Sequence, residues 1–416
     1  MQDAGATPTS SSGATIEFER VTKHYDAASM KTGAGAVDDL SLTVPAGRIC
    51  VLVGPSGCGK TTTLKMVNRL IEPTSGRILI DGPDISNRDV TDLRRGIGYV
   101  IQQVGLFPHQ TIAENVGTVP RLLGWPRDRQ QRRSDELLAL VGLEPGKYGD
   151  RYPSQLSGGE RQRVGVARAL AADPPVMLMD EPFGAVDPIV RERLQNEFLR
   201  LQEDLAKTIL FVTHDIDEAI KMGDLGVVMQ TGGKIAQAGA PADLLASPAS
   251  DYVARFVGAD RGLKRLSLYR VGDVALQEAP TVRVGDRAEH VREQATTDGD
   301  DFVLLVDDQI RPLGWVEVAD LEPGSRIAEA DADPMSPLLD RRTTLKDATS
   351  RLLDAEVRNG VVVDRHGAVL GLLTLRAVMA WMQDDRSRTV PADIAVVVAE
   401  VEPADDPEAS RREAAD

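Results

Sequence analysis

Aromatic residues and cysteines are scarce in this sequence. Aromatic side chains make up 4% of the 416 residues, so the cores are expected to be mostly aliphatic. The cysteines are Cys50 and Cys58. Two cysteines are too few for the disulfide framework of small secreted domains, which favours a reducing compartment. The chain is also too long for one compact core, so two or more domains are expected.

Positive charge is in deficit. The formal net charge is −16 at pH 7, and about −11 of it falls after residue 260. This balance argues against a nucleic-acid binder, because such proteins gather lysine and arginine on one face. We therefore expect no nucleic-acid partner.

Long apolar runs are absent as well. No run reaches the ~18 residues that a membrane-spanning helix requires. The first residues have neither the basic segment nor the apolar core of a signal peptide. Residues 1–14 and 384–416 are predicted to be tails without fixed structure, apart from a short strand at residues 394–401.

Between these tails, the pattern predicts two kinds of fold. In residues 15–258 apolar strands alternate with helices, which indicates an α/β domain with a mainly parallel sheet. Residues 259–275 contain a basic cluster and are interpreted as a linker. Beyond them "VDDQIRPLGWV" aligns without a gap with "VDRHGAVLGLL". This repeat predicts two β-α-β-β-α units, residues 276–329 and 330–383, packed together as one small domain.

The most specific motif is "GPSGCGKT", from Gly54 to Thr61. It fits the phosphate loop G-x-x-x-x-G-K-[ST] and lies between an apolar strand and a helix, as the motif requires. Glycines let backbone N–H groups turn toward phosphate oxygens, Lys60 places a charge on the β/γ bridge, and the Thr61 hydroxyl ligates Mg²⁺. Cys58 is interpreted as a small filler without a redox role. The residues expected to bind ATP here are Gly54, Pro55, Ser56, Gly57, Cys58, Gly59, Lys60, Thr61 and Thr62.

A second motif, "VMLMDE", ends an apolar strand in two carboxylates. Asp180 can hold Mg²⁺ through water, and Glu181 can accept a proton from an attacking water as general base. Alone, such a pair is weak evidence, because strand-end carboxylates are often simply solvated. Downstream of a phosphate loop, the catalytic interpretation is favoured.

With these motifs, residues 15–258 resemble the ATP-binding cassette of ABC transporters. The resemblance implies that Tyr25 in "KHYD" stacks on adenine, although a strand-end tyrosine can also pack on the core. In "GYVIQQVGLFPH", Gln102 resembles the glutamine that joins the Mg²⁺ site to the transmembrane subunit, with Gln103 as the adjacent alternative. Asp187 in "PFGAVDP" resembles the D-loop aspartate, although Gly-Ala-Val replaces the commoner Ser-Ala-Leu. His214 in "FVTHD" resembles the switch histidine that contacts the γ-phosphate.

The stretch "LSGGE" matches the signature loop of that family, with Ser157, Gly158, Gly159 and Glu160. The resemblance implies a head-to-tail homodimer, in which ATP lies between the phosphate loop of one copy and the signature loop of the other. The signature loop needs no lysine of its own, because the other copy provides Lys60. Backbone and hydroxyl donors at the start of a helix are sufficient to bind the γ-phosphate.

The narrower resemblance is to ATPase subunits that import quaternary amines and related osmoprotectants: glycine betaine, choline, carnitine or proline. It rests on "KMVNRLIEPTSGRILIDG", "IGYVIQQVGLFPHQTIAENV" and "EPFGAVDPIVR". It implies transmembrane permease subunits and an extracytoplasmic substrate-binding protein as partners. The chain is then expected to be peripheral on the cytoplasmic face of the inner membrane. The alternative is a soluble ABC ATPase or a nucleotide-sensing regulator not coupled to a permease.

The C-terminal repeat resembles a pair of cystathionine-β-synthase-type (CBS) domains, which such ATPase subunits carry. CBS pairs often bind adenine nucleotides through a Gly-x-x-Thr-x-x-Asp pattern, and neither copy here is complete. "GWVEVAD" keeps Asp320 but has Glu317 in place of Thr, and "GLLTLRA" keeps Thr374 but has Ala377 in place of Asp. Adenine nucleotide binding and a purely structural or dimerising role therefore both stay open.

Overall fold

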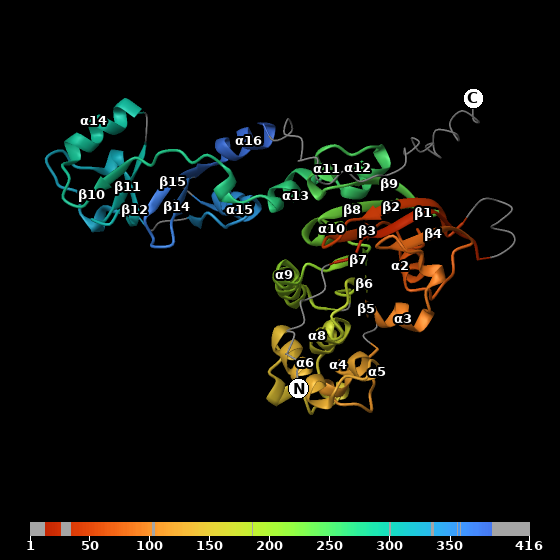
Figure 1. The fold of residues 1–416 in the computed structure, drawn as a ribbon. Helices are drawn as coiled ribbons and strands as arrows, with labels where there is room; N and C mark the ends of the chain where they lie inside the picture. Colours follow the sequence, from red (N-terminus) through yellow and green to blue (C-terminus); the bar gives the residue numbers. More distant parts are fainter. Residues whose placement is uncertain are drawn as a thin grey trace, which may run out of the picture. The chain divides into compact units, whose positions relative to one another are not determined.

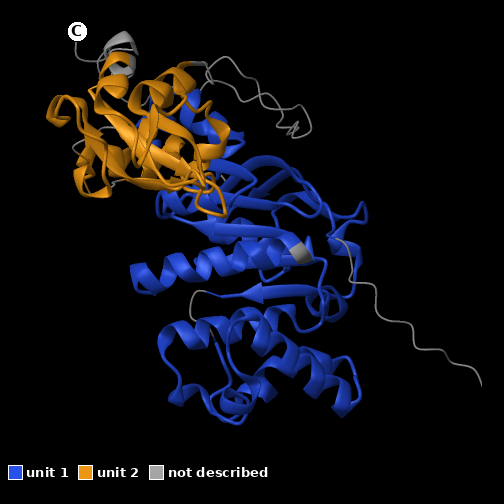
Figure 2. Ribbon diagram, turned by 90° about the vertical axis from the view of Figure 1, so that its left-hand side faces the viewer, with its two compact units in different colours: residues 1–259, 392–416 blue, residues 260–391 orange. Residues whose placement is uncertain are grey.

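The chain divides into two compact units at residue 260 (Figure 2). The computed structural model describes residues 13–25, 35–101, 105–184, 186–298, 301–333, 337–355, 357 and 359–384. Most of both predicted tails, including the strand expected at residues 394–401, lies outside the described residues.

Unit 1 is built on a six-stranded sheet with the order β5-β6-β7-β3-β8-β9 (Figure 1). All neighbours are parallel except the hairpin β8–β9. Every residue of β3, β6 and β7 is buried, which explains their continuous apolar runs. The strands are β3 (Ile49–Val53), β5 (Ile97–Val100), β6 (Val176–Asp180), β7 (Thr208–Thr213), β8 (Leu225–Gln230) and β9 (Lys234–Gly239).

A smaller antiparallel sheet completes the core of unit 1. Its order is β2-β1-β4, with β1 (Ile16–Lys23), β2 (Val37–Val44) and β4 (Ser75–Ile80). One buried cluster joins Leu42 of this sheet, Leu52 of the large sheet and Leu64 of α2 (Lys60–Val67). The helix that follows the phosphate loop is therefore fixed by apolar contacts with both sheets.

The remaining helices of unit 1 form a helical subdomain beyond β5 and cover the sheet (Figure 1). In the subdomain, α4 and α6 pack on α8, the helix that begins at the signature loop. The subdomain helices are α4 (Ile112–Val116), α5 (Thr118–Leu122), α6 (Arg127–Leu140), α7 (Pro145–Tyr148) and α8 (Gly158–Leu170). The others are α3 (Val90–Arg95), α9 (Pro188–Leu205), α10 (Ile216–Met222), α11 (Pro241–Ala246) and α12 (Asp251–Val257).

Unit 2 consists of two three-stranded sheets with the same topology. In each, the first pair of strands is parallel and the second antiparallel, with a register shift at Leu305/Val306 and at Val362/Val363. The first repeat contains β10 (Thr281–Arg283), α14 (Ala288–Asp298), β11 (Phe302–Val306) and β12 (Pro312–Glu317). The second contains β13 (Leu338–Asp340), α15 (Leu345–Asp354), β14 (Asn359–Val363), β15 (Val369–Thr374) and α16 (Leu375–Asp384).

The first repeat differs from its expected pattern in one element. The second repeat ends in α16, whereas the described residues after β12 form only short 3-10 turns at Val318–Asp320 and Glu329–Asp331. The sequence here contains Pro323 and Gly324, which disfavour a continuous helix. The helix predicted to close the first unit is therefore replaced by turns.

Residues 259–275, interpreted above as a linker, are folded, and from Asp260 onward they are part of unit 2. They form α13 (Arg261–Leu268) and a 3-10 turn at Val271–Asp273. Leu266 and Val271 are buried in the same cluster as Leu345 of α15, so this segment is part of the fold of unit 2. The basic cluster of this segment is not entirely at the surface, because Arg265 is only 4% exposed.

Candidate nucleotide-binding site

The phosphate loop joins the buried strand β3 to α2. Gly57 and Gly59 have positive φ of 81° and 99°, a conformation that favours glycine. Gly54 packs so closely on the carbonyl of Met229 that no Cβ fits there. Cys58 is buried, as a small filler would be. The loop is therefore shaped by close backbone contacts that its glycines permit.

Lys60, at the start of α2, is 6% exposed. Its Nζ donates to the carbonyl oxygens of Gly54 at 2.7 Å and Pro55 at 2.9 Å. The ammonium group thus lies inside the curve of the loop. The first turn of α2 contains no acidic residue, and Gly59 offers no capping side chain. This leaves first-turn N–H groups available to an anion.

Thr61 and Asp180 lie together beside the loop. The Thr61 Oγ1 donates to Asp180 Oδ1 at 3.0 Å. Asp180 is the last residue of β6, and burial raises the pKa of its carboxyl group. A hydroxyl and a carboxylate oxygen are hard ligands of the kind that Mg²⁺ accepts.

Glu181 and His214 follow the neighbouring parallel strands β6 and β7. Because parallel strands end at the same edge, the two side chains meet, with His214 Nδ1 3.1 Å from Glu181 Oε1. Glu181 has a positive φ of 45°, which is uncommon for a residue other than glycine. Its side chain is 22% exposed and that of His214 is 60% exposed, so water can reach the pair.

Tyr25 follows the end of β1 and is 62% exposed, so it is not a core residue. Its hydroxyl is 3.2 Å from Thr62 Oγ1, which ties it to the first turn of α2. The ammonium of Lys23 lies 5.5 Å from the centre of the ring. An exposed ring beside the phosphate loop can accept a planar base by stacking.

The signature loop begins α8 with a reciprocal cap. Glu160 N donates to Ser157 Oγ at 3.3 Å, and Ser157 N donates to Glu160 Oε2 at 2.7 Å. Gly158 is exposed and Gly159 is partly exposed. In the described part of the chain, the hydrogen bonds of the Ser157 and Glu160 side chains stay within the helical subdomain. The loop therefore presents an open helix N-terminus.

Comparison with known proteins bears on these observations. The family model described as "ABC transporter" matches residues 37–184. The osmoprotectant import ATP-binding protein OsmV of Salmonella typhimurium is 45% identical over 377 residues, which is 90% of this chain and 97% of that protein. The glycine betaine/carnitine/choline transport ATP-binding protein OpuCA of Bacillus subtilis is 42% identical, covering 89% of this chain and 96% of that protein.

The chain belongs to the ABC transporter family. A solved relative agrees with this: cbiO1 from Clostridium perfringens, part of the ABC transporter complex cbiONQ, has a TM-score of 0.52 and 26% identity, covering 61% of this chain and 94% of that chain. The predicted ABC cassette fold and the resemblance to osmoprotectant importer ATPase subunits are thus confirmed. The cassette is an ATP-binding ATPase domain.

The remaining residues expected in the cassette are Asp187 and Gln102. Asp187 caps α9 by accepting from Ile189 N at 3.0 Å. Gln102 and its alternative Gln103 lie outside the described residues. The motifs did not indicate Arg168 of α8, which donates to the carbonyl of Gly105 at 2.8 Å. This contact ties α8 to the chain just after Gln102 and Gln103.

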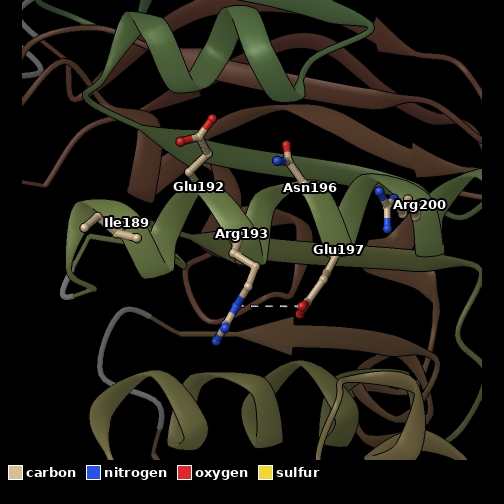
Figure 3. A pocket seen from close by; sticks show the side chains of 6 residues that line it. All are labelled: Ile189, Glu192, Arg193, Asn196, Glu197 and Arg200. Atoms are coloured by element: carbon tan, nitrogen blue, oxygen red, sulfur yellow. Dashed lines mark ion pairs between the residues drawn. The ribbon is translucent and has the colours of Figure 1, made fainter. Parts of the chain in front are cut away.

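A shallow hollow along the exposed face of α9 is distinct from the cassette's phosphate loop. Figure 3 shows Arg193 and Glu197 pointing the same way from this helix, with their ion pair at 3.9 Å. The hollow is lined by Ile189, Glu192, Arg193, Asn196, Glu197 and Arg200. All six belong to α9 itself, so the hollow offers none of the phosphate-binding groups described above.

No helix among the described residues of this ABC protein is long and apolar enough to span a membrane.

Proposed function

We propose that this chain is the ATP-hydrolysing subunit that powers import of a quaternary amine osmoprotectant (glycine betaine, choline, carnitine or proline) through a membrane permease. The transport role is supported by the similarity to OsmV. The alignment covers 377 residues, so the similarity extends beyond the cassette into unit 2. The hydrolytic role is supported by Glu181 and His214, which meet beside Lys60, Thr61 and Asp180 at one edge of the sheet.

Each side chain has a role in the proposed hydrolysis. Lys60 leaves its loop carbonyls and neutralises charge on the β- and γ-phosphates. Glu181 accepts the proton of the attacking water, and His214 orients Glu181 and contacts the γ-phosphate. Tyr25 stacks on adenine. Gln102 is the third catalytic residue of the proposal, together with Glu181 and His214.

Magnesium fits the same site. Thr61 and Asp180 would hold it, together with Gln102, while phosphate oxygens and water fill the remaining positions. Within the described residues no group of three or more acidic, histidine or cysteine side chains could cage a metal alone. This suits an ion that arrives with ATP. When bound, Mg²⁺ would neutralise phosphate charge.

We further propose that two copies form the active unit. Ser157, Gly158 and Gly159 of one copy would donate to the γ-phosphate bound at Lys60 of the other, with Asp187 nearby in the same interface. Transmembrane permease subunits and an extracytoplasmic substrate-binding protein complete the importer, with this chain on the cytoplasmic face of the membrane. Unit 2 would act on this assembly as a CBS-type regulatory module.

The incomplete nucleotide pattern of unit 2 limits what that module binds. Thr374 Oγ1 accepts from Ala377 N at 3.1 Å and so caps α16. Because Glu317 stands where the pattern has Thr and Ala377 where it has Asp, we favour a structural or dimerising role over adenine nucleotide binding.

Uptake of labelled osmoprotectants tests the proposal. Cells that lack this chain should lose uptake of betaine, choline, carnitine or proline, and the intact chain should restore it. The variant Glu181→Gln, expressed at the same level, is the matched control and should not restore uptake. Restoration by Glu181→Gln, or no loss in cells that lack the chain, would contradict the proposal.

A further inference from the structure

The signature loop of this chain contains an anion where it is proposed to bind one. Glu160 lies in the first turn of α8, two residues from Gly158. In the proposed dimer the γ-phosphate of ATP approaches this same turn. Two negative charges a few ångströms apart repel strongly in a site from which water is excluded. The Glu160 carboxylate must therefore be held back from the phosphate position.

Two hydrogen-bond donors hold the Glu160 carboxylate against the helical subdomain of the same copy. Ser157 N donates to Oε2 at 2.7 Å, and the hydroxyl of Tyr148 donates to Oε1 at 2.8 Å. The hydrogen bond from Ser157 is the main cause that lowers the pKa of Glu160, so the group stays ionised at neutral pH. The hydrogen bond to Glu160 raises the pKa of Tyr148, which keeps its phenol protonated as the donor.

The same arrangement leaves the loop's other donors open. Ser157 Oγ accepts from Glu160 N, so its own hydrogen is available to a phosphate oxygen. The N–H groups of Gly158 and Gly159 belong to the first turn and have no partner within the helix. Gly158 is exposed, and a Cβ there would meet nothing within 4 Å, so the space beside this residue is open.

Tyr148 is held firmly enough to act as a support. It ends α7, where its N donates to Glu144 O at 3.0 Å and its O accepts from Arg151 N at 3.1 Å. The carbonyl of Arg151 in turn accepts from Ile112 N at 2.8 Å, at the start of α4. The guanidinium of Arg151 lies 4.9 Å from the centre of the tyrosine ring.

We propose that Tyr148 is a positioning residue of the ATP site of the partner copy: it keeps the Glu160 carboxylate turned away from the γ-phosphate and leaves the donors of Ser157, Gly158 and Gly159 free. This inference rests on the proposed role of the signature loop in the dimer. It predicts that the hydroxyl of Tyr148 matters only while residue 160 carries a charge.

A double-variant cycle tests this dependence. Full-length Tyr148→Phe should bind ATP as monomer with unchanged affinity, since Lys60 and its loop are intact. Its KM for ATP hydrolysis should rise about tenfold, the loss expected for one hydrogen bond to a charged group. In the Glu160→Gln background the same substitution should change KM by less than about twofold. Tyr152→Phe removes a neighbouring hydroxyl and should leave KM unchanged.

Three results would overturn the inference. The first is an unchanged KM in Tyr148→Phe. The second is an equally large effect in the Glu160→Gln background, which would mean that Tyr148 supports the fold rather than the charge. The third is an equal effect of Tyr152→Phe. Ser157→Arg separates this inference from the proposed function. If Ser157→Arg keeps wild-type turnover, the signature loop has no role in trans; if it is inactive while Tyr148→Phe is normal, only the role of Tyr148 fails.

Discussion

Gly57 and Gly59 of the phosphate loop should differ sharply in their tolerance of a methyl group. Both have positive φ, and an alanine in that conformation costs roughly 1–2 kcal/mol. A Cβ at Gly57 would meet nothing within 4 Å. A Cβ at Gly59 would overlap the carbonyl oxygen of Ala36 and lie 3.2 Å from Val37 Cγ2. Val37 is the fully buried first residue of β2 and Ala36 directly precedes it, so neither can easily give way.

The overlap adds about 1–3 kcal/mol to the cost of Gly59→Ala, as overpacking does in other cores. Gly59→Ala should therefore lower the free energy of unfolding by about 2–5 kcal/mol and Gly57→Ala by about 1–2 kcal/mol. In a unit of this size, 1 kcal/mol corresponds to about 2–4 °C in Tm.

Scanning calorimetry without nucleotide measures this difference, and the transition of unit 2 serves as an internal reference. The transition of unit 1 should fall further in Gly59→Ala than in Gly57→Ala, while that of unit 2 stays constant. Equal shifts in the two variants would refute the idea that close contact with Ala36 shapes the loop.

Three further outcomes are expected. Glu181→Gln should lower ATP turnover by about 10²–10⁴-fold and accumulate an ATP-bound dimer in size-exclusion chromatography; turnover near wild type would exclude Glu181 as the base. Asp173→Asn should destabilise unit 1 by about 3 kcal/mol in urea titration, because Lys207 is fully buried and its Nζ lies 2.7 Å from Asp173 Oδ1. Lys207→Met should lower the free energy of unfolding less than Asp173→Asn does, since the Asp173 side chain that it leaves unpaired with Lys207 is partly exposed; the reverse order would contradict this account. Burial raises the pKa of Glu218, so its ionisation opposes folding. The wild type should therefore lose stability relative to Glu218→Gln as pH rises from the ordinary carboxyl pKa through the raised value, and parallel pH profiles would refute the assignment.

Local motifs carried most of what could be predicted about the site. The phosphate loop and the strand ending in Asp180 and Glu181 are contiguous, and their spacing reflects how a loop wraps phosphate or how a strand presents carboxylates. The contact between Glu181 and His214 cannot be predicted from a contiguous motif. It depends on β6 and β7 being neighbours in the sheet, an order that no local pattern records.

The features that the sequence did not predict are contacts between distant segments. Tyr148 reaches Glu160 because α7 packs beside the start of α8, and Arg168 reaches Gly105 across the subdomain. The segment interpreted as a linker has an apolar face, but only its packing on α15 shows that it belongs to unit 2. The repeat in unit 2 was visible as sequence similarity, whereas the loss of a helix from the first copy required the structure.

The central claim is that one ATP site is built from two copies of this chain. Lys60→Ala keeps a normal signature loop, and Ser157→Arg keeps a normal phosphate loop, so each variant alone should be inactive. A mixed dimer contains one site with both parts intact. Measuring ATP turnover while the two purified variants are mixed should therefore reveal activity that neither has alone. If turnover stays absent at every ratio although mixed dimers form, the shared site is wrong.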